Sequence, residues 1–64
     1  MTSQEFGQIC KKARVRAELT QVQVAKRTGI HVNYYSRIER GEVNVSLEKI
    51  NNILKILNIK ITLP

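Results

Sequence analysis

The side chains that commonly perform catalysis are few in this chain and lie far apart. Its 64 residues include one histidine, His31, one cysteine, Cys10, and five acidic residues. No Gly-x-Ser-x-Gly motif, phosphate-binding loop or metal-ligand spacing accompanies them. A redox-sensing thiol usually needs exposure and a second cysteine, so Cys10 is better explained as a small core residue. We therefore expect that the protein is not an enzyme and that it has no cofactor and no metal site.

Positive charge is the more informative chemical property of the sequence. Eleven Lys and Arg residues oppose five Asp and Glu residues, which gives a formal net charge of +6. This balance favours a polyanionic partner, and a solvated basic surface explains it as well. The N-terminal residues lack the apolar stretch of a signal peptide, and no apolar run approaches the roughly 20 residues of a membrane span. We expect a cytoplasmic protein with no membrane partner.

The elements that must position these side chains are predicted to be helices. Hydrophobic spacing predicts an all-α, four-helix bundle that forms a single domain over residues 1–64. The helices are expected over about residues 3–17, 21–28, 32–40 and 47–57. Their inward-facing residues are expected to be Phe6, Ile9 or Cys10, Ala13 and Ala17 in the first helix, Val24 and Ala25 in the second, and Leu47, Ile50, Leu54 and Leu57 in the fourth.

Capping residues mark where these helices begin. Thr2 and Thr20 each stand three residues before a Glu or Gln, which is the spacing of a capping box. Ser46 can cap the fourth helix, and either His31 or Asn33 can cap the third. Each helix is thus expected to have its own start signal.

The C-terminal end carries more apolar surface than a four-helix monomer needs. Apolar and polar residues alternate over 59–63, which is the pattern of a short strand. Such a strand can pair with its counterpart in a second copy, so we expect a homodimer. The alternative is a tail that folds back on its own bundle or frays. The residues expected in the dimer interface are Ile53, Ile56, Ile59, Ile61 and Leu63.

The second and third predicted helices have the features of a helix-turn-helix unit. The small Ala25 falls where two helices cross closely, and Gly29 follows four residues later to make the turn. Ile30, Tyr35 and Ile38 supply buried anchors for the third helix. This arrangement is the one that inserts a helix into the major groove of DNA.

The segment LTQVQVAKRTGIHVNYYSRIERGEVNVSLEKI resembles the phage-repressor-like (Xre/Cro) helix-turn-helix family. It matches the Thr-Gln opening, the central Ala, the turn Gly, the Arg-Ile-Glu-Arg-Gly close and the following Ser-Leu. The resemblance implies a compact lambda-repressor-like bundle and a structural ion pair between Arg14 and Glu39. Thr28 and Tyr35 depart from the family pattern, where larger and smaller aliphatic residues, respectively, are more usual.

The same resemblance places four residues on the face of the third helix that reads bases. Asn33 can make a bidentate contact to adenine, and Arg37 can reach O6 and N7 of guanine. Val32 can pack on a thymine methyl group. The alternative is that all four are ordinary exposed helix residues. The predicted base-reading set is Val32, Asn33, Ser36 and Arg37.

A second set is expected to contact DNA phosphates. Gln21 opens the second helix, where its amide and nearby backbone N–H groups can face a phosphate. For His31 a role as an N-cap competes with this assignment, and for Tyr34 packing against the fourth helix competes with it. The predicted phosphate-contacting set is Gln21, His31, Tyr34, Arg40 and Asn44.

These features predict a regulator that binds double-stranded DNA in a sequence-specific manner. We expect a dimeric repressor that reads a palindromic operator with its third helix. The chain is also similar to HipB-type antitoxins, which implies repression of its own operon. It is similar as well to restriction-modification controller proteins, which can activate as well as repress. The alternative is a protein-interaction module or antitoxin whose main partner is a toxin or a polymerase subunit.

Overall fold

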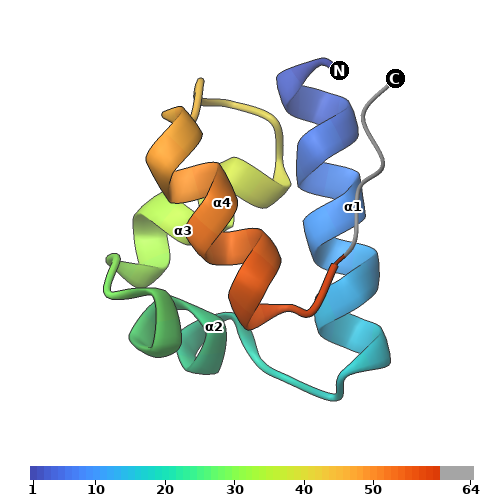
Figure 1. Ribbon diagram of the computed structural model, residues 1–64, viewed down its shortest axis with the longest axis vertical. Coiled ribbons are helices and arrows are strands. Elements are labelled where there is room, and N and C mark those ends of the chain that lie inside the picture. Colours follow the sequence, from blue (N-terminus) through green and yellow to red (C-terminus); the bar gives the residue numbers. More distant parts are fainter. Residues whose placement is uncertain (60–64) are drawn as a thin grey trace.

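The structure is a computed structural model that describes residues 1–59, and these residues form a bundle of four helices (Figure 1). In chain order the helices are α1 (Ser3–Arg16), α2 (Gln21–Thr28), α3 (Val32–Glu39) and α4 (Leu47–Ile56). Every bound lies within one residue of the prediction, which is the ordinary uncertainty of a helix end. The predicted strand over 59–63, with Ile61 and Leu63, lies outside the described residues except for Ile59.

Each helix starts at a polar side chain that accepts a backbone N–H hydrogen bond. The two predicted capping boxes are present, Thr2 with Glu5 in α1 and Thr20 with Gln23 in α2. Ser46 caps α4, and His31 rather than Asn33 caps α3. These acceptors satisfy N–H groups that have no partner within the first turn of a helix.

The four helices also end in the same way, at a residue with positive φ. These residues are Glu18, Gly29, Gly41 and Asn58. After α3, for example, the Gly41 N–H donates to the Ile38 carbonyl at 3.0 Å and the Glu42 N–H donates to the Arg37 carbonyl at 3.0 Å. This pair of bonds is the Schellman motif, which satisfies the last carbonyl groups of a helix and turns the chain away sharply.

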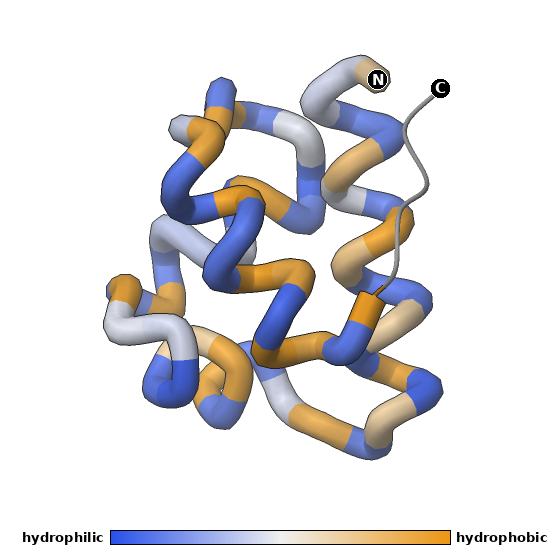
Figure 2. The backbone as a smooth tube through the Cα atoms, viewed as in Figure 1, coloured by the Kyte–Doolittle hydropathy of each residue, from blue (hydrophilic) through white to orange (hydrophobic). Residues whose placement is uncertain are grey.

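The core lies between the four helices: α1 packs on α3, α3 packs on α2, and α2 packs on α4. Figure 2 shows apolar and polar segments alternating along these helices. Cys10 belongs to this core, and burial raises the pKa of its thiol to about 12. The buried apolar side chains are Phe6, Cys10, Val24, Ala25, Tyr35, Ile38, Ile53 and Leu57.

Helix α4 turns a different face to the core from the one that the sequence predicted. Ile53, expected in a dimer interface, is 1% exposed, whereas Leu47, expected inside, is 76% exposed. Ile53 stands three residues after Ile50 and four before Leu57, so these three side chains share one face of the helix. Leu47 is the first residue of α4 and lies at the edge of the bundle. Ile53 is therefore a core residue, and its assignment to a dimer interface was wrong.

Ala17 also differs from its predicted position. It was expected on the inward stripe of the first helix, but it is exposed and forms the C-cap of α1. The helix ends at Arg16 because the chain turns away at Glu18, which has a positive φ. Ala17 therefore lies just beyond the helix and not on its inward face. Of the other predicted dimer residues, Ile56 and Ile59 are half-buried, and Ile59 packs against the core.

Candidate nucleic-acid interface

The turn between α2 and α3 is fixed by backbone hydrogen bonds and by a buried hydroxyl group. Gly29 has a φ of 74°, and the Ile30 N–H reaches back 3.1 Å to the Ala25 carbonyl. The Thr28 hydroxyl donates to the Val24 carbonyl at 2.8 Å, so this departure from the family pattern is accommodated by a hydrogen bond within α2. The Asn52 side chain of α4 donates to the Thr28 carbonyl at 3.1 Å. The turn between α2 and α3 is therefore held by its own backbone and by a contact from α4.

A buried ion pair attaches α3 to α1. Arg14 Nε lies 2.6 Å from Glu39 Oε2, and Arg14 Nη2 lies 3.1 Å from Glu39 Oε1. The two side chains are 14% and 3% exposed, and Arg14 Nη1 also donates to the Leu19 carbonyl at 3.0 Å. The ion pair implied by the family resemblance is thus present as a bidentate contact. It joins α1, the α1–α2 turn and the end of α3.

Gln21 adds a third donor to the same carboxylate. Its Nε2 donates to Glu39 Oε1 at 2.9 Å. Burial acts to raise the pKa of Glu39, but the hydrogen bonds from Arg14 and Gln21 outweigh it and leave that pKa below its usual value. The side chain expected to face a phosphate therefore donates inward, and the groups left at this helix start are the first backbone N–H groups of α2.

Tyr35 completes the buried polar cluster without a hydrogen bond of good geometry. Its hydroxyl oxygen is buried beside Glu39 and has no hydrogen-bond partner among the described residues. Burial raises the pKa of Tyr35, so the phenol stays neutral. Its ring anchors α3 in the core, which is where the sequence placed it.

The outward face of α3 carries the predicted base-reading residues at helical spacing. Asn33 and Arg37 are exposed, and Ser36 is half-buried between them. Val32 is half-buried and packs against the core, so only part of this side chain faces outward. The structure thus brings Asn33, Ser36 and Arg37 together on one surface, with Val32 at its margin.

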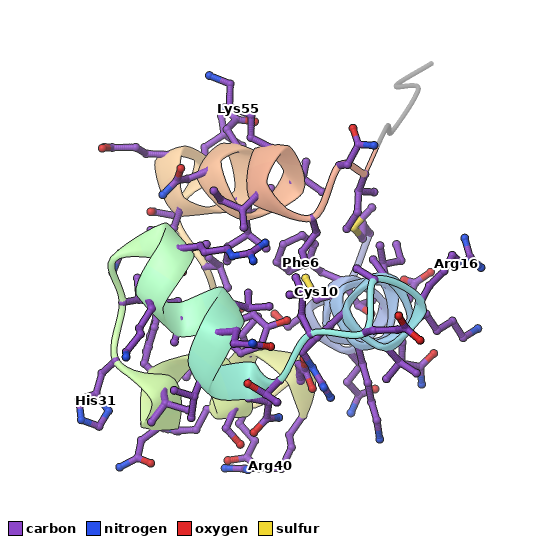
Figure 3. All side chains as sticks on the ribbon, turned by 90° about the horizontal axis from the view of Figure 1, so that it is seen from below. Phe6, Cys10, Arg16, His31, Arg40 and Lys55 are labelled. Carbon is purple, nitrogen blue, oxygen red and sulfur yellow. The ribbon has the colours of Figure 1, made fainter. Side chains whose placement is uncertain are left out.

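Arg40 lies across this surface rather than only at the end of the helix. Its Nη1 donates to the Ser36 hydroxyl at 2.7 Å, and its Nε donates to Glu42 Oε2 at 2.5 Å. Arg37 Nε lies 3.8 Å from Glu42 Oε1. In Figure 3 the labelled Arg40 and His31 are both on the α3 side of the molecule, opposite Lys55 on α4. We call Asn33, Ser36, Arg37 and Arg40 the reading face.

The other predicted phosphate contacts surround the reading face. His31 Nδ1 accepts the Asn33 N–H at 3.1 Å, which places the proton of a neutral ring on Nε2, the outer nitrogen. Asn44 Oδ1 accepts the Ser3 hydroxyl at 2.8 Å, and its amide nitrogen is the end that can donate. Tyr34 packs toward α4, since Lys49 Nζ lies 4.7 Å from the centre of its ring.

Two residues of this surface were missed by sequence reasoning. Glu42 follows Arg40 by two residues, and this nearby opposite charge was the available signal. Lys49 is separated from Tyr34 by a helix end and a loop, so no spacing rule connects them. The contact of Lys49 with Tyr34 becomes recognisable only when α3 and α4 are placed in space.

Other types of site find no support in residues 1–59. In this range no three His, Cys, Asp or Glu residues are grouped closely enough to hold a metal ion. None of the four described helices has the length and apolarity needed to cross a membrane.

Comparison with known proteins agrees with this geometry. A helix-turn-helix family model matches residues 11–63, which include all of α2, α3 and α4. The chain is also similar to the control protein C.BamHI of Bacillus amyloliquefaciens, with 38% identity over 56 residues. That match covers 86% of this chain and 69% of the relative.

Proposed function

The chain belongs to the helix-turn-helix family and is a DNA-binding transcriptional regulator, and we propose that it acts as a dimeric repressor of its own promoter. The observation that carries this proposal is the reading face, which presents amide, hydroxyl and guanidinium groups from one rigidly held helix. The formal net charge of +6 supplies the attraction to DNA.

In this proposal α3 enters the major groove with Asn33, Ser36 and Arg37 of the reading face toward the bases, while Arg40 lies at the edge of the groove. Asn33 is suited to adenine and Arg37 to guanine, because each can form two hydrogen bonds to one base edge. The exposed part of Val32 would meet a thymine methyl group. The Arg14–Glu39 ion pair contributes by holding α3 at a fixed angle, so that these contacts form together.

Phosphate contacts would flank the groove on both sides. The first N–H groups of α2 face one strand, in place of the inward-directed Gln21 amide. His31, Asn44 and Arg40 would contact the backbone near the two ends of α3, and the Tyr34 hydroxyl would contribute beside Lys49. These contacts set register and affinity but carry no base preference.

A dimer would place two reading faces about 34 Å apart, one helical turn of DNA. Among the described residues, half-buried Ile56 and Ile59 are the remaining candidates for the interface. Ile61 and Leu63 continue the same apolar pattern in the sequence. Repression follows if the dimer covers promoter sequence that polymerase needs. The name of the relative, a control protein, supports a regulatory role of this kind.

The test is selection of bound duplexes from a random DNA pool by the purified protein, followed by sequencing. Enrichment of a palindrome with half-sites about one turn apart would support the proposal. Affinity for the selected duplex should then fall with salt at a logarithmic slope near −7, if a dimer neutralises about eight phosphates. The proposal would be overturned if no DNA sequence is enriched and if the affinity for duplex DNA does not change with salt concentration. That result would favour a protein partner, such as a toxin or a polymerase subunit.

A further inference from the structure

An acidic side chain lies among the cations of the reading face. The Glu42 carboxylate contacts Arg40 through Nε at 2.5 Å and Nη2 at 3.5 Å, and it lies 3.8 Å from Arg37 Nε. The hydrogen bond from Arg40 lowers the pKa of Glu42, so the carboxylate remains ionised well below neutral pH. One acid thus faces two of the guanidinium groups that the proposed function directs at DNA.

The position of Glu42 is set by the end of α3 rather than by a loose loop. Its backbone N–H donates to the Arg37 carbonyl, the outer bond of the Schellman motif. Gly41, the residue before it, has a φ of 73° and approaches Gln4 of α1 so closely that a Cβ atom there would lie 2.8 Å from the Gln4 Cα. The backbone from which the carboxylate extends is therefore held in place by α3 and by α1.

We propose that Glu42 determines specificity by restraining Arg37 and Arg40 on the reading face and limiting their attraction to phosphates. This inference rests on the proposed function. Non-specific binding depends almost entirely on cations that neutralise phosphates, and a carboxylate beside those cations repels the same phosphates. Glu42 thereby weakens binding to DNA of any sequence.

Operator binding is less affected by the carboxylate, because of the atom at which it meets Arg37. Glu42 faces Arg37 at Nε, which leaves the two Nη groups to reach O6 and N7 of guanine. Arg40 is held more firmly, because its Nε donates to Glu42 and its Nη1 donates to Ser36. A guanidinium restrained in this way loses less conformational entropy when it meets the right base. The carboxylate therefore raises the ratio of operator affinity to non-specific affinity.

The experiment compares the 64-residue protein with its Glu42→Gln variant on the selected duplex and on a scrambled duplex of equal length. Binding is measured by fluorescence anisotropy over a series of salt concentrations. We expect Glu42→Gln to raise affinity for the scrambled duplex by about three- to tenfold and to steepen its logarithmic salt slope by about one. Affinity for the selected duplex should change less, so the ratio of the two affinities falls.

Glu48→Gln is the matched control, since it removes the same charge from an exposed residue that forms no ion pair among the described residues. The inference predicts that Glu48→Gln leaves the affinity ratio unchanged. It also predicts that Glu42→Gln has less than half its effect in an Arg40→Ala background, because Arg40 is the cation that donates hydrogen bonds to the carboxylate. Circular dichroism checks that each variant is folded.

The possible results separate this inference from the proposed function. If the wild type prefers the selected duplex and Glu42→Gln prefers it equally, the role of Glu42 is overturned and the function stands. Equal effects of Glu42→Gln and Glu48→Gln on the affinity ratio overturn it as well, because such a result is explained by the change in net charge alone. A wild type that binds neither duplex overturns the proposed function, and the role of Glu42 with it.

Discussion

Gly7 of α1 packs directly against the C-terminal end of α3, where a Cβ atom at position 7 would lie 2.6 Å from the Glu39 carbonyl oxygen. The Ile38 carbonyl oxygen is also within contact distance of that Cβ position. The two helices approach this closely because Gly7 has no side chain, and the approach brings Arg14 to Glu39.

Gly7→Ala should therefore destabilise the protein, although alanine favours a helix over glycine by about 1 kcal/mol. Backbone carbonyls cannot move aside cheaply, and overpacking of this kind costs about 1–3 kcal/mol. The free energy of unfolding in urea measures the effect. Gln8→Ala, at an exposed position of the same helix, should be neutral or slightly stabilising. A Gly7→Ala variant as stable as the wild type would show that α1 and α3 can separate freely.

The ion pair of Glu39 should make stability depend on pH in the acid range. Its pKa is lowered from an ordinary value of 4.5, so the stabilisation is fully present above that pH and is lost as the pH falls through the lower, folded-state pKa. Glu39→Gln leaves Arg14 without its counter-charge and should cost about 3–5 kcal/mol at neutral pH. Thermal unfolding of both proteins from pH 7 to pH 3 tests this. The destabilisation by the variant should shrink on acidification, and a constant difference would contradict the assignment.

Arg37→Ala should relax the base preference at one position of each half-site and cost about 1–3 kcal/mol of operator affinity. The reason is the loss of a bidentate contact that distinguishes guanine from the other bases. Repeating the selection with the variant shows which position loses its preference. Lys11→Ala, which removes a cation from an exposed site on α1, should leave every preference in place. An unchanged Arg37→Ala motif would mean that the reading face is assigned wrongly.

Two truncations in α4 should separate its buried face from its exposed one. Ile53→Ala removes a side chain that is 1% exposed and should cost about 2–5 kcal/mol, because it leaves a cavity in the core. Leu47→Ala removes one that is 76% exposed and should change stability by less than about 0.5 kcal/mol. Urea unfolding of the two variants measures the contrast. Equal losses would place Leu47 in an interface that the monomer does not contain.

The helices could be predicted because the residues that start and end them lie within or next to each helix in the sequence. Thr2 and Thr20 with their capping partners, and Gly29 with its left-handed conformation, act within one turn of the chain. The reading face could be predicted because Asn33, Ser36 and Arg37 follow helical spacing.

Contacts between distant residues were harder to foresee. The Gln21 amide turns inward because Glu39, 18 residues away, accepts it, and nothing near Gln21 in the sequence signals that acceptor. The buried face of α4 was misplaced because Leu47 and Ile53 are both apolar at compatible spacings. Only the packing of the other helices decides which of them is covered.

The positive-φ endings of all four helices have a consequence for how the chain reaches its fold. Each helix has a polar N-cap and its own Schellman turn, so its limits are set before any other helix is present. A small helical domain dominated by contacts close in sequence folds on a timescale of about microseconds to milliseconds. A nascent or transiently unfolded copy would therefore recover its reading face quickly, and it would expose its apolar residues only briefly.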